Sequence, residues 1–158
     1  MLFRSVIAGS GEEAYENQLK ARVTGKGLTD VVRFAGWVDG EEKRNLLQRA
    51  SLFALPSKHE NFGVAVLEAL TAGVPAIISR DVQLAPELAT ANAGWVVDAT
   101  HEALAMALNH AMSHEQLRAD RGRAAAKLAK QFAWPAVATR MVELYTDRKS
   151  TRLNSSHT

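Results

Sequence analysis

The chain has 158 residues, 47% of them hydrophobic, and 19 basic against 17 acidic side chains give it a formal net charge of +2. This length and composition are typical of one ordinary globular domain. There is no cysteine, which excludes disulfides, thiolate metal sites and cysteine nucleophiles and fits a reducing cytoplasm. Basic and acidic residues are interleaved, so no nucleic-acid-binding stripe is predicted, and no apolar run approaches the ~20 residues of a membrane span.

Strands and helices are predicted to alternate along the chain. Short apolar runs rich in β-branched residues indicate strands, and amphipathic segments between them indicate helices. The predicted strands are residues 3–8, 31–35, 51–55, 75–79 and 94–97. The predicted helices are residues 12–23, 41–49, 64–72, 101–113, 115–132 and 134–147. Gly73 closes the helix over 64–72, because glycine commonly follows a helix end.

This alternation predicts a Rossmann-like α/β fold, with a parallel sheet that carries helices on both faces, because parallel strands need crossover connections. Ligands in such sheets bind at the carboxyl ends of the strands. The loops to consider are therefore residues 9–11, 36–39 and 57–63 and the loop that starts at Arg80.

Residues 149–158 are polar and aperiodic, and we expect them to be disordered. They resemble the translation of a cloning read-through, so residues 1–148 are expected to form the domain. Lys149 and Arg152 supply the basic excess, since the rest of the chain has 17 basic and 17 acidic side chains.

The first loop, from Gly9 to Ala14, fits the G-x-G-x-x-A pattern of dinucleotide-binding proteins. Glu12 and Glu13, however, occupy the first turn of the following helix, where their charge opposes a bound phosphate. A tight strand-to-helix turn is the preferred interpretation. It is compatible with Gly9 and Gly11 lining a nucleotide pocket without gripping phosphate. The two acids also disfavour a dinucleotide-dependent oxidoreductase, one of the alternative functions.

The segment from Ser57 to Pro75 places Glu60 after a strand and Glu68 in a helix. In a structural interpretation, Ser57 and Glu60 form a capping box, and Glu68 lies on the solvent face of the helix. In a functional interpretation, Glu60 lies beside the N–H groups of residues 61–64 at a helix N-terminus, which are the donors that a diphosphate requires. An unpaired Glu68 in this apolar stretch would be costly.

The segment from Ser57 to Pro75 resembles the E-x7-E region of retaining glycosyltransferases with the GT-B fold, in the large group often called family 4. The resemblance covers about residues 3–147 and includes the Ile-Ala-Gly-Ser-Gly turn and the Phe-Ala-Gly-Trp-Val strand end. It implies the C-terminal, donor-binding domain of an enzyme that transfers a sugar from a nucleoside diphosphate sugar to an acceptor. The resemblance also implies retention at the anomeric carbon and no requirement for a metal ion or another cofactor.

The resemblance assigns different parts of the donor to different residues. It implies that Glu60 is the catalytic residue, facing the hydroxyls of the donor sugar, and that Glu68 faces the ribose hydroxyls. The amides of residues 62–64 are expected to approach the sugar and diphosphate, and the backbone of residues 37–39 to flank the base. The full set of implied donor-binding residues is Glu68, Asn61, Phe62, Gly63, Val64, Gly9, Gly11, Trp37, Val38 and Asp39.

One departure from the family pattern affects the expected activity. Family members carry an Arg and a Lys that clamp the diphosphate, in a segment before the strand that corresponds to residues 3–8. Arg4 and Lys58 do not occupy these places. The resemblance therefore implies that the first strand, the cation pair and the N-terminal acceptor domain, which is the expected partner, are missing. The chain alone is expected to be inactive.

Further expectations concern the alternative function, the location, a histidine pair and the tryptophans. The alternative function is a non-catalytic nucleotide-binding module, and the expected location is cytoplasmic, which leaves open a membrane association of the parent protein. His110 and His114 have helical i, i+4 spacing but no accompanying carboxylate, so a solvated helix face is preferred to a metal site. Trp95 and Trp134 are expected in the core or an interface, and Trp37 is the candidate for stacking on a ligand.

Overall fold

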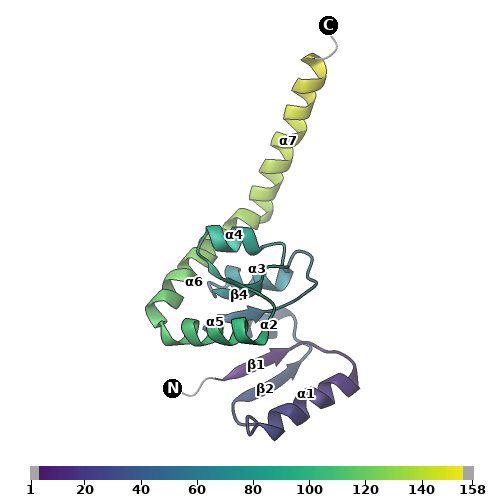
Figure 1. Cartoon of the computed structure of the whole chain (residues 1–158). Coiled ribbons are helices and arrows are strands. Elements are labelled where there is room, and N and C mark those ends of the chain that lie inside the picture. The colour runs from purple at the N-terminus through teal and green to yellow at the C-terminus, as the bar shows by residue number, and fades with distance from the viewer. Residues whose placement is uncertain (1–3, 155–158) are drawn as a thin grey trace. The chain divides into compact units, whose positions relative to one another are not determined.

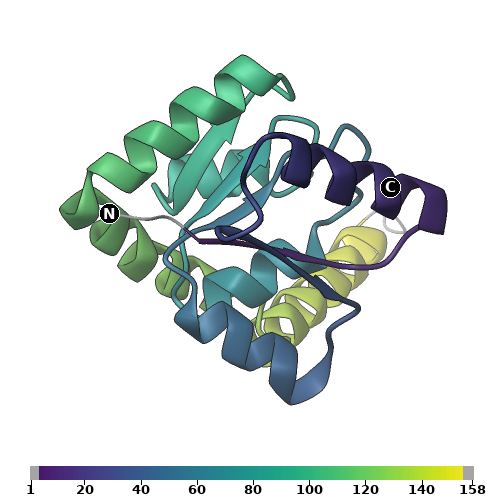
Figure 2. The same ribbon diagram turned by 90° about the horizontal axis from the view of Figure 1, so that it is seen from below.

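The computed structural model describes the backbone of residues 4–154 and the side chains of residues 4–147. The chain divides into two compact units, of which the first ends at Leu46 and the second begins at Leu47. Both are built from parallel strands and the helices that connect them (Figures 1 and 2). The predicted α/β class, with parallel strands flanked by helices, is confirmed.

The first unit is built around one β–α–β crossover. Strand β1 (Ser5–Ala8) pairs in parallel with β2 (Val32–Gly36), and helix α1 (Glu13–Gly25) connects them. Helix α2 (Gly40–Arg49) begins in this unit and contains the boundary between the units. Phe3, where the first strand was predicted to begin, lies outside the described residues.

The side chains of the first unit are only partly covered. Among residues 4–46 none is fully buried. The sequence offered Ala14, Leu19 and Val23 of α1 for a buried face, and the structure half-buries Leu19 and Val23 but leaves Ala14 exposed. The crossover therefore has little core of its own.

The second unit contains a parallel sheet with the order β3-β4-β5. Phe53 in β3 is opposite Ala76 in β4, which is opposite Gly94 in β5. The elements are β3 (Phe53–Leu55), α3 (Val64–Thr71), β4 (Ala76–Ser79), α4 (Ala85–Thr90), β5 (Gly94–Val97), α5 (His101–Ser113), α6 (Glu115–Ala129), the 3-10 helix η1 (Lys130–Phe132) and α7 (Trp134–Asn154).

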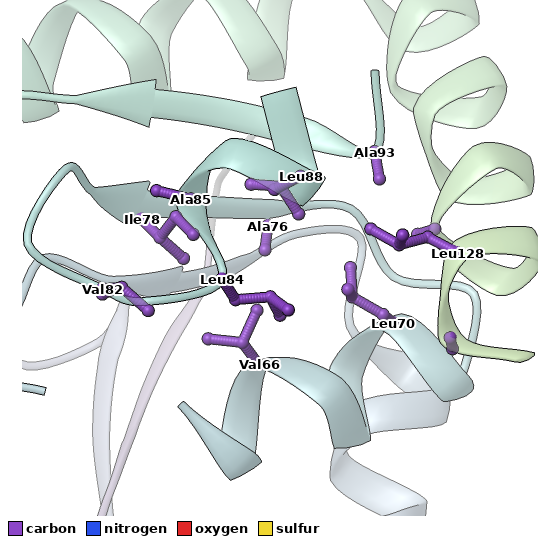
Figure 3. Close-up of a cluster of buried hydrophobic side chains, with 12 residues drawn as sticks. Val66, Leu70, Ala76, Ile78, Val82, Leu84, Ala85, Leu88, Ala93 and Leu128 are labelled. Carbon is purple, nitrogen blue, oxygen red and sulfur yellow. The ribbon is translucent and has the colours of Figure 1, made fainter. Parts of the chain in front are cut away.

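The central strand β4 has helices on both of its faces. Successive side chains of a strand point to opposite faces, and every residue of β4 is buried. Ala76 and Ile78 pack with residues of α3, α4 and α6, as Figure 3 shows for Leu70, Leu88 and Leu128. Ile77 packs on the other face with α5. The core of the described chain therefore lies in the second unit, on both faces of its sheet.

Helix α3 ends as the sequence predicted, and α6 passes close to that end. Gly73 has φ of 76° and follows the helix, where its N–H donates to the Leu70 carbonyl and the Val74 N–H donates to the Ala69 carbonyl. A Cβ added to Gly122 of α6 would lie 2.6 Å from the Gly73 carbonyl oxygen. Glycine at residue 122 therefore allows α6 to approach the end of α3.

Helix α7 differs from its prediction at its far end. It continues to Asn154, so the predicted end at Asp147 is wrong. The expected disorder of residues 149–158 stays a prediction, and residues 155–158 lie outside the described part. Residues 148–154 contain no glycine or proline, so nothing in them breaks the helix. Adding a turn to an existing helix is also easier than starting a new one. Figure 1 shows α7 extending away from the sheet of its unit, and Trp134 at its start is 84% exposed, so it is not a core residue.

Three other differences concern pairing and short elements. The strands pair in two parallel sheets and not in one, because hydrophobic periodicity identifies strands but not their neighbours. Helix α4 was not predicted, since its six residues are too few for a helical period to show. The helix predicted to reach Phe132 changes at Ala129 into the 3-10 turn η1.

None of the helices in the described part is both long and apolar enough for a membrane span.

Candidate functional site

In the second unit, the loops that leave the carboxyl ends of β3 and β4 are tied together. Glu60 forms an isolated parallel bridge with Val82, and the Gln83 N–H donates to the Asn61 carbonyl at 3.3 Å. Val82 is 1% exposed and belongs to the core. A core residue therefore anchors the loop that carries Glu60, at the edge of the sheet where parallel α/β folds bind ligands.

These two loops line an open hollow of about 600 Å³. All of the lining side chains are charged or polar: Lys58, His59, Glu60, Asn61 and Asp81. Glu60 is half-buried and the other four are exposed. Carboxylate and amide oxygens accept hydrogen bonds from hydroxyl groups, and bonds to a charged acceptor are the stronger kind. The hollow therefore suits a ligand rich in hydroxyl groups.

The start of the loop is held by two serines. Ser79 of β4 is fully buried and its hydroxyl donates to the Ser57 carbonyl, while the Ser57 hydroxyl oxygen accepts from the His59 N–H at 3.3 Å. Helix α3 begins only at Val64, after Gly63 as its N-cap. The capping box between Ser57 and Glu60 is therefore wrong, because Ser57 lies outside the helix and shapes the loop before it.

Gly63 sets the path of the chain into α3. It has φ of 77°, and an added Cβ would lie 3.1 Å from Val82 Cγ1 and 3.2 Å from Val66 Cγ2. Both the conformation and the space favour glycine. Within the described residues, the N–H groups of Val64 and Ala65 donate to no backbone carbonyl, as is usual in the first turn of a helix. These groups are available to an anionic ligand.

Phe62 and Glu68 lie on either side of this helix start in the sequence. The ring of Phe62 meets that of Phe132 in η1 edge to face, with centroids 5.8 Å apart. Glu68 lies in α3, where it is half-buried and has an interaction partner. The loop residues 60–63 and the carboxylate of residue 68 thus belong to one unit with a shared core.

The remaining predicted residues lie in the first unit. The Gly9 N–H donates to the Gly36 carbonyl at 2.7 Å, and the Gly11 N–H donates to Glu16 Oε1 at 3.0 Å. A carboxylate of α1 therefore occupies an amide of the glycine turn, in keeping with the structural interpretation of that turn.

Trp37, Val38 and Asp39 follow the end of β2, again in the first unit. Trp37 is 72% exposed and its Nε1–H donates to Asp39 Oδ2 at 3.4 Å, while Val38 is half-buried. The structure brings Trp37 and Asp39 together within this unit. The role of the Trp37–Asp39 backbone beside a base stays a prediction.

Two charged residues of the hollow were not among the predicted site residues. Asp81 follows the carboxyl end of β4, in the loop from Arg80 that the sequence singled out without naming Asp81. Lys58 was set aside because it does not match the expected clamp, yet it lines the hollow. The position of Asp81 just after a parallel strand is the signal that could have identified it.

His110 of α5 and His114, which directly follows this helix, form part of a structural cluster. The rings of His110 and His114 have centroids 4.4 Å apart, and His114 Nδ1 lies 2.8 Å from the His110 carbonyl oxygen. The guanidinium of Arg121 lies over the ring of Trp95 with its centre 4.4 Å from the centroid, and burial lowers the pKa of Arg121. Arg121 also donates to the Gly94 carbonyl, so this cluster joins α6 to β5.

Comparisons of sequence identify relatives of the chain. The family model described as Glycosyl transferases group 1 matches residues 3–128. The GDP-mannose-dependent alpha-(1-6)-phosphatidylinositol dimannoside mannosyltransferase of Mycobacterium tuberculosis is 35% identical over 140 residues, covering 88% of this chain and 34% of that protein. The chain thus spans about a third of the length of this relative.

Solved structures share the fold. HepE from Anabaena in complex with UDP matches with a TM-score of 0.79 and 23% identity, over 92% of this chain and 41% of that one. The C-terminal domain of the group 1 glycosyl transferase LpcC from Francisella tularensis matches with a TM-score of 0.70 and 21% identity, over 81% and 68%. The α/β fold with parallel sheets and flanking helices matches the C-terminal domains of GT-B glycosyltransferases.

Proposed function

Since the chain belongs to the family Glycosyl transferases group 1, we propose that it binds the nucleoside diphosphate sugar from which a retaining, family 4 glycosyltransferase takes its sugar. The observation that carries the proposal is the polar hollow of the second unit, where Glu60 stands at the carboxyl end of a parallel sheet. HepE, which shares the fold, is known in complex with UDP and with UDP-glucose.

The proposed site divides the donor among three chemical environments, for the sugar, the diphosphate and the ribose. The carboxylate of Glu60 accepts hydrogen bonds from the sugar hydroxyls and is the residue that we assign to catalysis. The N–H groups at the start of α3 face the diphosphate, because a helix N-terminus carries partial positive charge. Glu68 accepts from the ribose hydroxyls, and the backbone around Asn61, Phe62 and Gly63 shapes the site.

Transfer breaks the bond between the anomeric carbon of the sugar and the diphosphate, so negative charge develops on the departing diphosphate. Donors aimed at that charge before it develops are a large source of catalysis. The amides of the α3 start supply part of this stabilisation in the proposed mechanism, which needs no metal ion.

The acceptor binds to a further domain in this proposal, as the chain spans about a third of its relative. Holding two reactants together can lower a barrier by roughly 7 to 11 kcal/mol. The chain by itself therefore binds the donor without transferring its sugar.

The test compares Glu60→Gln and Glu68→Gln by isothermal titration calorimetry with UDP, GDP, UDP-glucose and GDP-mannose. Glu68→Gln weakens both nucleoside diphosphates and nucleotide sugars, because both contain ribose. Glu60→Gln weakens only the nucleotide sugars. Each lost bond to a charged group costs about 1.5 to 3 kcal/mol.

The control is Glu102→Gln, which removes an exposed carboxylate from α5 outside the hollow and should change no affinity. Equal losses for both ligand classes in both variants would remove the division of roles. A chain that binds none of the four ligands would refute the donor site itself.

A further inference from the structure

Asp81 is held in a fixed position at the rim of the hollow. It lies in a tight turn after β4, in which the Val82 N–H donates to the Ser79 carbonyl at 3.2 Å. Ser79 is fully buried and Val82 is 1% exposed, so core residues anchor both ends of this turn. The Arg80 N–H donates to the Val97 carbonyl at 3.0 Å, which fixes the turn to the end of β5 as well. An exposed carboxylate thus stands on a rigid backbone.

The carboxylate of Asp81 is not used by the fold. Its neighbour Arg80 pairs with Asp98, with Nε 2.5 Å from Oδ1, and is therefore directed toward the end of β5. Within the described side chains, Asp81 has no hydrogen bond and no ion pair, although Lys58 lines the same hollow. Aspartate often serves a turn by accepting from a backbone N–H two residues on, but Asp81 makes no such bond. Its oxygens are free to accept from a ligand.

Asp81 and Glu60 approach the hollow from different loops. Glu60 bridges to Val82, so Asp81 precedes the residue that faces Glu60 across the bridge. Two carboxylates on separate rigid loops accept hydrogen bonds at two separate places around a bound ligand. A sugar ring satisfies both only if its hydroxyl groups point to both, and a mismatched epimer leaves one carboxylate unpaired. Sites built on such bonds reject analogues that cannot make them.

We propose that Asp81 is a second sugar-contacting carboxylate and that it determines, together with Glu60, which configuration of donor sugar is accepted. This rests on the proposed donor site and adds to it a residue that reads the sugar and not the nucleotide. The specificity for the sugar is therefore divided between the loop after β3 and the loop after β4.

The experiment measures affinities of the full 158-residue chain for UDP, GDP, UDP-glucose, UDP-galactose and GDP-mannose, by calorimetry or by NMR titration where binding is weak. The variant is Asp81→Asn, which keeps the size and removes the charge. The control is Asp120→Asn, which removes a charge from α6 outside the hollow. Asp81→Glu keeps the charge and moves it outward by one methylene.

We expect Asp81→Asn to leave the affinity for the nucleoside diphosphate within about twofold and to weaken the preferred nucleotide sugar by about tenfold or more, as loss of a bond to a charged group does. The ratio of affinities between the two UDP-sugar epimers should shrink by a similar factor if the chain uses UDP donors. Asp81→Glu should alter that preference without restoring it, and Asp120→Asn should behave like the unchanged chain.

Three outcomes would overturn the proposal. If Asp81→Asn binds every nucleotide sugar like the unchanged chain, Asp81 does not contact the sugar, while the donor site stands. If it weakens nucleoside diphosphate and nucleotide sugar equally, with an unchanged melting temperature, the residue acts on the nucleotide. If the unchanged chain binds no nucleotide at all, the donor site fails and the specificity role fails with it.

Discussion

Ile77 and Ile78 of β4 are fully buried in the second unit, whereas Ile7 of β1 in the first unit is 40% exposed. Both strands are parallel and both are followed by a loop that the sequence connected with ligand binding. Burial of an isoleucine contributes about 1.5 to 3 kcal/mol relative to its exposure. The two units therefore use one pattern of strands and helices with very different amounts of apolar stabilisation.

This difference bears on the sites in each unit. The hollow around Glu60 is anchored by Val82 and Ser79, both of which are buried in the core. The loop at Trp37 is held by backbone bonds from the Gly9 N–H to the Gly36 carbonyl and from the Lys43 N–H to the Asp39 carbonyl. No residue from 36 to 39 is fully buried, and Trp37 is 72% exposed. A site needs its residues held firmly by their surroundings. The second unit meets this requirement by itself.

The largest effect should come from a methyl group added to the second unit, compared with a methyl group added to the first. A Cβ at Gly94 would lie 2.0 Å from the Ala76 carbonyl oxygen, so Gly94→Ala must separate β4 from β5 and should lower the free energy of unfolding by about 3 kcal/mol or more. Gly11→Ala in the first unit meets nothing within 4 Å and should change it by less than about 0.5 kcal/mol. Urea denaturation followed by circular dichroism measures both. Equal losses would mean that the two units are packed alike.

Shortening one leucine in each unit tests the same difference in packing, by removing side-chain atoms and not by adding them. Leu88 of α4 is fully buried, and Leu88→Ala should cost about 3 kcal/mol of unfolding free energy through lost contacts and a cavity. Leu19 of α1 is only half-buried, so Leu19→Ala should cost about 1 kcal/mol. Thermal denaturation of the two variants would rank them. A larger loss for Leu19 would contradict the placement of the core in the second unit.

Much of the second unit could be predicted from the sequence because its local signals agree with its packing. The strand over 94–97 and the helix over 101–113 have the predicted ends. Thr100 precedes that helix, and its hydroxyl oxygen accepts from the Ala103 N–H at 3.2 Å. This N-cap depends only on residues that are close in the sequence. Gly73 likewise marks the end of α3 by a local signal, a glycine just after the last turn of the helix.

The features that were missed depend on residues far apart in the sequence or on short segments. The bridge between Glu60 and Val82 joins two loops, and no local pattern records it. Asp81 looks like an ordinary turn residue until the hollow is known. Helix α4 begins with proline in its first turn, a helix-start signal that its six residues were too few to reinforce. The pairing of strands into two sheets likewise depends on contacts between segments.

A smaller effect should follow from Phe132→Leu, which removes the edge-to-face contact with Phe62. Such contacts contribute about 0.5 to 1.5 kcal/mol beyond the buried area. Because Phe62 belongs to the loop of the hollow, we expect nucleotide-sugar affinity to fall several-fold with a modest loss of stability. Phe34→Leu, at a half-buried ring in the first unit, is the matched control and should leave that affinity unchanged. Calorimetry on both variants decides, and equal affinities would separate the ring pair from the site.

The smallest effect should come from ending the chain after Arg148, which removes the last part of α7. Residues 141–147 of this helix are all exposed, including Leu144 at 66% and Tyr145 at 67%. The helix therefore no longer packs against the core at the point where the deletion starts. Removing helix beyond that point takes away backbone hydrogen bonds that are exchanged for bonds to water, and the free energy of unfolding should change by less than about 0.5 kcal/mol. Ending the chain after Lys130 is the contrasting truncation, because it also removes Phe132, which packs against the core, and should cost more than about 1 kcal/mol. Urea denaturation of both truncated chains measures the difference, and a loss of several kcal/mol from the shorter deletion would show that the end of α7 packs against the second unit.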